Sequence, residues 1–215
     1  MYIILLTMII SAISQIFIVR ILNKYETDYN CDDVLERAIK FHAVKKPKII
    51  ITKHRFSAHF NLDENIIKVF LNNSENLKLG DMYILLHEFS HYVYFLKNSI
   101  SRENLRISNM LKGIGYLLII LLIYIVFVAE RLDQIQLIGT MVTLSIIFLF
   151  FEIYEIFYND FLEYKANKMT IELIKACFMK YRISVITKTI LLYNHFISRV
   201  LKVLFYFVVM SFTFV

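Results

Sequence analysis

The sequence contains one proline, four glycines and no tryptophan among 215 residues, while 58% of its residues are hydrophobic. Soluble domains rarely have this composition, so a membrane protein is the first expectation. There are two cysteines, Cys31 and Cys177, and they lack the Cys-x-x-Cys spacing of a thiolate metal site. Their number and separation argue against a disulfide framework, and we expect two ordinary thiols.

Charge is absent from four stretches of the chain, which contain no Asp, Glu, Lys or Arg: Met1–Val19, Gly113–Ala129, Leu137–Phe151 and Val203–Val215. A helix that spans the hydrocarbon core of a bilayer needs about 20 apolar residues. We therefore expect about four transmembrane helices rather than buried core helices, at 1–19, 113–129, 134–151 and 191–215, the last being either transmembrane or interfacial. The last is the weakest, because it brings His195, Arg199 and Lys202 toward the membrane.

Basic residues fall mainly in the two polar regions between these stretches. Fifteen of the 24 Lys and Arg residues lie in 20–112, and eight follow Phe151. The positive-inside rule then predicts that 20–112 and 152–188 face the cytoplasm in a multi-pass protein of the cell membrane. The net charge of +6 does not indicate nucleic-acid binding, because membrane topology already accounts for where the cations lie.

The region 20–112 is long enough for a small folded unit. Residues 32–41 have helical spacing and follow Asn30 and Asp32, either of which can cap a helix. Lys48–Thr52 and Ile66–Leu71 are rich in β-branched residues and flank a polar stretch, as two strands joined by a turn would. Met82–Leu96 then alternates apolar residues around a helix that begins after Gly80 and Asp81.

This last helix carries the chemistry, in the run His87-Glu88-Phe89-Ser90-His91. Residues four apart lie on one helix face, so both imidazoles can reach one tetrahedral Zn²⁺ ion. Glu88 projects about 100° away from His87 around the helix and can take a proton from a zinc-bound water. We therefore predict His87 and His91 as metal ligands and Glu88 as the general base.

Two histidines leave a catalytic zinc ion one protein ligand short. The candidates after the third apolar stretch are Glu152, Glu155, Asp160 and Glu163, and their spacing alone does not choose among them. Ala166 favours Glu163, because a small residue lets its helix approach the His87–His91 helix. Asp160 is the better candidate for orienting a histidine ligand from behind.

A family resemblance also selects Glu163. Leu85–His91, two apolar stretches and then Glu163-Tyr164-Lys165-Ala166-Asn167-Lys168 resemble membrane-integral gluzincins, a class of zinc metallopeptidases in which a Glu-x-x-Ala helix supplies the third zinc ligand. The similarity covers roughly residues 47–175 and extends to two groups: the YugP-like neutral zinc metallopeptidases, and the HtpX and CAAX-protease family. Asn167 departs from the second group, many members of which have Asp there.

These observations together predict a mainly α-helical membrane protein with a small α+β, zincin-like cytoplasmic domain at 20–112. Its expected function is hydrolysis of peptide bonds near the cytoplasmic membrane face by one catalytic Zn²⁺, with polypeptides, including membrane proteins, as substrates and the lipid bilayer as surroundings. Phe60–Leu71 can supply an edge strand that pairs with an extended substrate. The alternative is a catalytically silent membrane sensor or scaffold that binds zinc.

Overall fold

A computed structural model of the chain describes residues 18–52, 58–61, 64–98, 110, 113–114, 117, 134–181 and 183–213. The chain divides into two compact units. The first, here called the α+β unit, combines Ile9–Ile100 with Leu162–His195. The second, here called the helical unit, contains Met1–Met8, Ser101–Phe161 and Phe196–Val215.

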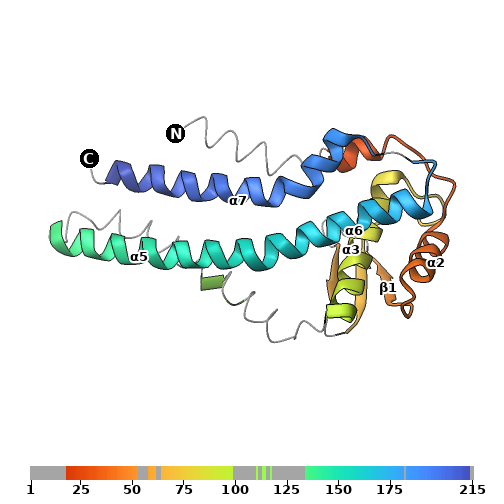
Figure 1. Cartoon of the computed structure of the whole chain (residues 1–215), viewed down its shortest axis with the longest axis horizontal. Coiled ribbons are helices and arrows are strands. Elements are labelled where there is room, and N and C mark those ends of the chain that lie inside the picture. The colour runs from red at the N-terminus through yellow and green to blue at the C-terminus, as the bar shows by residue number, and fades with distance from the viewer. Residues whose placement is uncertain are drawn as a thin grey trace. The chain divides into compact units, whose positions relative to one another are not determined.

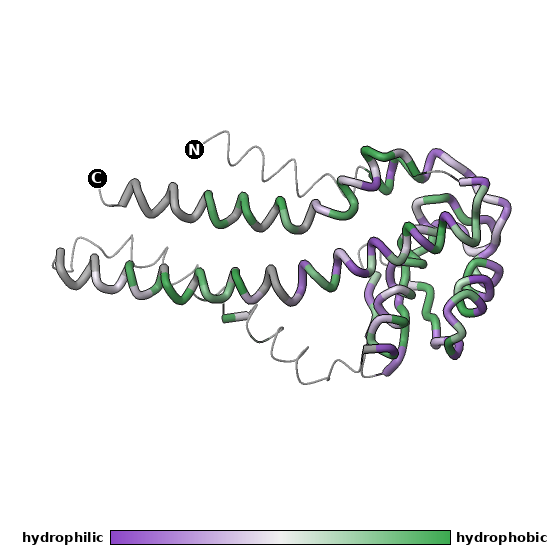
Figure 2. The backbone as a smooth tube through the Cα atoms, viewed as in Figure 1, coloured by the Kyte–Doolittle hydropathy of each residue, from purple (hydrophilic) through white to green (hydrophobic). Residues whose placement is uncertain are grey.

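Helix α2 of the α+β unit spans Cys31–His42, close to the predicted 32–41 (Figure 1). It begins where Asn30 accepts a hydrogen bond from the backbone of Asp33, which satisfies one of the free N–H groups of the first turn. It ends at Ala43, whose left-handed conformation lets its N–H bond to the carbonyl of Ile39. Hydrophobic and hydrophilic residues alternate along this helix (Figure 2), and it buries Val34, Leu35 and Ala38.

A three-stranded sheet has the order β1-β3-β2. Strands β1 (Lys48–Ile51) and β3 (Ile66–Val69) lie where the sequence predicts strands, but they pair in parallel and are not the two arms of one hairpin. The antiparallel partner of β3 is a strand that the sequence analysis missed, β2 (His59–Asn61). Asn65, which has a φ of 52°, lies in the connection between β2 and β3, and asparagine tolerates this left-handed conformation.

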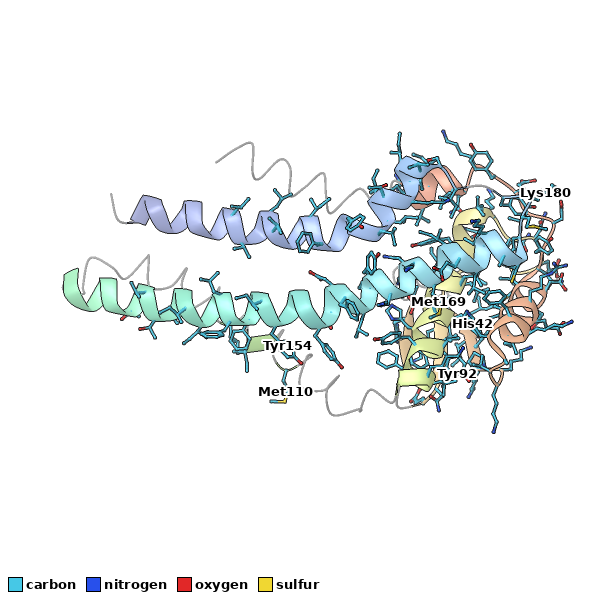
Figure 3. All side chains as sticks on the ribbon, viewed as in Figure 1. His42, Tyr92, Met110, Tyr154, Met169 and Lys180 are labelled. Atoms are coloured by element: carbon cyan, nitrogen blue, oxygen red, sulfur yellow. The ribbon has the colours of Figure 1, made fainter. Side chains whose placement is uncertain are left out.

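Helix α3, Leu79–Asn98, contacts β2, β3 and α2 and so forms the centre of the α+β unit. It begins earlier than the predicted Met82, because the N–H of Met82 already bonds to the carbonyl of Lys78. Asp81, in the first turn, accepts hydrogen bonds from the side chain and backbone of Asn72. Tyr92 (Figure 3) donates to the carbonyl of Lys45 at 2.9 Å. The helix buries a wide apolar face, made of Met82, Leu85, Leu86, Phe89 and Val93.

Two further helices complete the α+β unit. Helix α6, Phe161–Cys177, enters this unit at Leu162 and buries Ala166, Asn167 and Thr170 along one face. Helix α7, Val185–Thr213, belongs to the α+β unit as far as His195. The helical unit contains α5, Gln134–Glu155, which continues directly into a π-helical turn, η2, at Ile156–Asp160.

The prediction of about four membrane-spanning helices is wrong for the described part of the chain. No helix there is both long enough and apolar enough to cross a bilayer. In α5 only fifteen residues separate Gln136 from Glu152, fewer than the roughly 17 that a span needs, and in α7 only eleven residues follow Lys202. The predicted multi-pass location in the cell membrane is overturned by the same finding. Most of the predicted spans 1–19 and 113–129 lies outside the described residues.

The start of α3 leaves no room for a side chain at Gly80. A Cβ atom there would lie 2.6 Å from the carbonyl oxygen of Val19 and in contact with the side chain of Asn23. We expect Gly80→Ala to lower the free energy of unfolding by about 1–3 kcal/mol, the usual cost of overpacking. The control is Gly139→Ala in α5, where a Cβ meets nothing within 4 Å and helix propensity favours alanine. Chemical denaturation followed by circular dichroism measures both, and equal stability of the two variants would contradict the prediction.

Candidate metal centre

The two histidines of the predicted motif lie one turn apart on α3 and point to the same place. Their Nε2 atoms are 3.2 Å apart, and the two rings meet edge to face with centroids 4.8 Å apart. Both side chains are largely enclosed, with 16% of His87 and 13% of His91 exposed. The helical spacing of four residues is therefore sufficient to bring two nitrogen donors together.

Helix α6 supplies a carboxylate to the same place. One oxygen of Glu163 lies 3.2 Å from Nε2 of His87, and the other lies 3.5 Å from Nε2 of His91. The ligand atoms of the three residues all lie within 4.8 Å of one another. Imidazole nitrogens and a carboxylate oxygen that converge in this way can bind a metal ion.

The electrostatics of the three groups favour a cation between them. Burial acts to raise the pKa of Glu163, but hydrogen bonds and charge from His87 and His91 outweigh it and hold that pKa well below its usual range. Burial likewise acts to lower the pKa of His87, but the hydrogen bond and charge of Glu163 raise it, with smaller contributions from Glu88 and Asn167. Without a metal, the site therefore holds an ionised carboxylate and attracts a proton to His87.

Glu88 lies beside this group but is not one of its ligands. Its side chain belongs to a residue that is only 8% exposed, and it lines a cavity of about 300 Å³ together with His87 and Glu163. The rest of the cavity wall is mostly apolar and includes Val19, Ala58, Ile84 and Leu191. A buried carboxylate thus faces a space next to the metal-binding group that is large enough for part of a ligand.

The other carboxylates that the sequence left open do not join this group in the described part of the chain. Asp160 is buried at the end of η2, in the helical unit. The side chains of Glu152 and Glu155 lie outside the described residues. Sequence reasoning gave no role to Tyr83, although its position one turn before His87 places it on the same face of α3.

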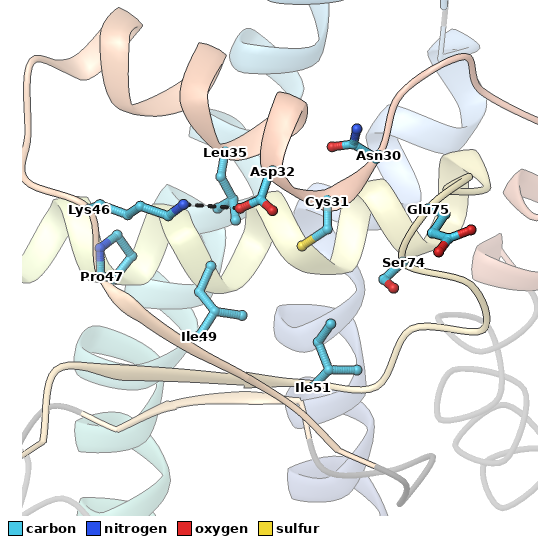
Figure 4. A pocket seen from close by; sticks show the side chains of 10 residues that line it. All are labelled: Asn30, Cys31, Asp32, Leu35, Lys46, Pro47, Ile49, Ile51, Ser74 and Glu75. Atoms are coloured by element: carbon cyan, nitrogen blue, oxygen red, sulfur yellow. Dashed lines mark hydrogen bonds and ion pairs between the residues drawn. The ribbon is translucent and has the colours of Figure 1, made fainter.

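A larger cavity, of about 540 Å³, lies elsewhere in the α+β unit, between α2 and β1 (Figure 4). Its charged residues include Asp32 and Lys46, which form an ion pair at 3.0 Å and so neutralise each other. Cys31 also lines it, and burial raises the pKa of this thiol to about 11, so that it stays protonated and weakly nucleophilic. Size alone does not make this cavity a reactive site, and it contains none of the three residues of the metal-binding group.

The contribution of Glu163 to metal binding can be measured directly. Glu163→Ala removes one of three donors, and we expect Zn²⁺ affinity to fall by more than about 100-fold, because losing a group that only orients a ligand already costs about 10–100-fold. Competition with a chromogenic chelator measures the affinity, with His87→Ala as the positive control. Glu172→Ala, an exposed glutamate on the same helix, serves as the matched control. Unchanged Zn²⁺ binding by Glu163→Ala would mean that another group is the third ligand.

The pH dependence of stability has opposite signs with and without metal. In the metal-free chain, the stabilisation from His87 is complete below its ordinary pKa of 6.5 and is lost as pH rises through the raised pKa. The stabilisation from Glu163 is present above pH 4.5, the ordinary pKa of a glutamate, and is lost as pH falls through its lowered pKa in the folded chain. The melting temperature of the metal-free chain should therefore fall as pH rises above about 6.5, and less so in Glu163→Gln.

Saturating Zn²⁺ should reverse this slope, because a metal ion binds the neutral imidazole and competes with the proton. Melting is followed by circular dichroism, since the chain has no tryptophan. The same slope with and without Zn²⁺ would mean that the ion does not bind His87.

Comparison with known proteins found no matching family model, no matching curated protein and no matching solved structure. The resemblance of residues 85–91 and 163–168 to the gluzincins therefore stays a prediction from sequence. The structure adds that His87, His91 and Glu163 lie close enough together to bind one metal ion.

Proposed function

We propose that this chain is a zinc-dependent peptidase in which Glu88 is the general base. The observation that carries the proposal is the shared cavity, in which the buried carboxylate of Glu88 stands beside His87 and Glu163. A carboxylate that is not needed to bind the metal, yet lies next to the metal ligands, suits proton transfer.

Two features support zinc as the ion. Two imidazoles and one carboxylate form a ligand set typical of catalytic zinc, with the fourth position left open. A tetrahedral ion with bonds of about 2.0–2.1 Å would hold its ligand atoms about 3.3 Å apart. The two Nε2 atoms are 3.2 Å apart. One oxygen of Glu163 lies 3.2 Å from Nε2 of His87 and its other oxygen lies 3.5 Å from Nε2 of His91, and these separations are close to that spacing.

Each group then has a distinct part in hydrolysis. His87, His91 and Glu163 would hold the Zn²⁺ ion, which when bound would act as a Lewis acid that polarises the peptide carbonyl and makes water more acidic. Glu88 accepts a proton from the attacking water and then donates it to the nitrogen of the departing amine.

The sheet offers a means of binding an extended polypeptide. Strand β2 is at one edge of the order β1-β3-β2, and Ala58, directly before it, lines the cavity of the metal-binding group. Phe60 holds this strand against α3 through ring contacts with Tyr92 and Phe95 at 5.7 and 5.8 Å. A substrate that adds to this edge by backbone hydrogen bonds would reach the site with little dependence on its sequence.

Glu88→Gln tests the proposal. The variant keeps the size of the side chain but removes its basicity, so we expect normal folding and Zn²⁺ binding with hydrolysis reduced by about 10²–10⁴-fold. A peptide library incubated with the purified chain and read by mass spectrometry supplies an assay without a known substrate. Cleavage by the wild-type chain should be abolished by a chelator and restored by Zn²⁺.

The control is Glu36→Gln, which changes an exposed glutamate on α2 and should cleave normally. Equal cleavage by Glu88→Gln and wild type, with Zn²⁺ bound to both, would exclude Glu88 as the base. Zn²⁺ binding without cleavage by either would favour the alternative function, a zinc-binding sensor or scaffold that does not hydrolyse peptides.

A further inference from the structure

A buried amide lies directly behind the metal-binding group. Asn167 is on α6, one turn after Glu163, and is only 2% exposed. Its Oδ1 accepts a hydrogen bond of 2.5 Å from the phenol of Tyr83 on α3, and its Nδ2 donates one of 2.8 Å to the backbone carbonyl of Leu191 on α7. One side chain therefore links three helices of the α+β unit.

This link also reaches His87. The ring of Tyr83 stacks on the imidazole of His87, with centroids 6.1 Å apart and an angle of 22° between the planes. Asn167 lines the same cavity as His87 and Glu163. Yet the buried Nδ1 of His87 has no hydrogen-bond partner among the described residues. Metal-binding histidines usually have their second nitrogen held by a partner, so the ring of His87 depends on its other contacts for orientation.

We propose that Tyr83, Asn167 and the carbonyl of Leu191 form a clamp that positions His87 and Glu163 for metal binding, and that the clamp requires an amide at position 167. The proposal rests on the proposed zinc site but not on peptide hydrolysis. Tyr83 and Asn167 are positioning residues, because they act on the metal ligands through contact and geometry and do not themselves bind the ion.

The requirement for an amide follows from the two neighbours of Asn167. An amide side chain offers both a donor and an acceptor, which match the carbonyl of Leu191 and the phenol of Tyr83. The phenol of Tyr83 is the donor in its bond to Oδ1 of Asn167, so this side of residue 167 must be an acceptor. An ionised aspartate of the same shape has only acceptors, and one of its oxygens would face the carbonyl oxygen of Leu191 without a proton between them, a costly arrangement in a buried position.

Two variants test the clamp. Tyr83→Phe removes the hydroxyl and keeps the ring that stacks on His87. Asn167→Asp keeps the shape of the side chain but replaces the amide donor with a charged carboxylate oxygen. We expect each to weaken Zn²⁺ binding by about 10–100-fold in chelator competition and to change the visible absorption spectrum of bound Co²⁺, which reports ligand geometry. The result for Asn167→Asp is the sharper one, because simple charge attraction predicts the opposite: a further carboxylate near the site, beside those of Glu163 and Glu88, would strengthen binding of a cation.

Thr170→Val is the matched control. Ser90 and Thr170 form another buried hydrogen bond between α3 and α6, at 3.0 Å, but neither touches the metal-binding group in the described contacts. This variant should lower the melting temperature while leaving Zn²⁺ affinity and the Co²⁺ spectrum unchanged. Melting of the metal-free variants by circular dichroism shows whether each is folded, and if Asn167→Asp does not fold, Tyr83→Phe decides.

Three results would overturn the clamp. The first is tighter Zn²⁺ binding by Asn167→Asp, and the second is an unchanged Co²⁺ spectrum and Zn²⁺ affinity in Tyr83→Phe. The third is a loss of affinity in Thr170→Val as large as in the clamp variants, which would assign the effect to general helix packing. None of these readings depends on peptide cleavage, so an inactive but zinc-binding chain would refute the proposed function and leave the clamp standing.

Discussion

The contact of α6 with α3 is the constraint on which the candidate site depends. Two histidines on one helix turn supply two donors, but the carboxylate of Glu163 is 72 residues further along the chain than His91 and reaches them only because these helices meet. Buried polar pairs, Ser90 with Thr170 and Tyr83 with Asn167, lie on the same contact. Since a buried polar group that loses its partner is costly, these pairs resist sliding of one helix along the other.

The charges at this contact explain why the site suits a cation. Glu163 is partly buried and ionised, and such a carboxylate needs a positive neighbour. In the metal-free chain, Glu163 raises the pKa of His87 and so favours a proton there. A metal ion bound by His87, His91 and Glu163 would compete with that proton. Glu88, on the wall of the same cavity, is not one of these three residues.

The sheet shows the limit of local patterns. Residues 48–52 and 66–71 were predicted as strands from their β-branched side chains, and strands occur at Lys48–Ile51 and Ile66–Val69. Their parallel pairing was not predicted, because the short strand His59–Asn61 takes the antiparallel place beside β3 and leaves β1 on the other side. A stretch of three residues is too short for its periodicity to identify a strand. The contact of Phe60 in β2 with Phe95 in α3 depends on tertiary packing, which the local sequence pattern does not contain.

Some properties of this protein follow from the sequence by itself. The helices at 31–42 and 79–98, and the meeting of His87 with His91, depend on capping and on the 3.6-residue turn, which are local. The expectation of four membrane spans failed for the described residues, because apolar composition does not determine whether a given helix contains an uninterrupted apolar stretch of spanning length. Spacing left four carboxylates open, and the sequence favoured Glu163 only through Ala166 and a family resemblance. The tertiary structure brings Glu163 to the two histidines and places Tyr83 and Asn167 beside them. These are contacts between residues far apart in the chain, and their formation depends on how whole helices pack rather than on the spacing within any one of them.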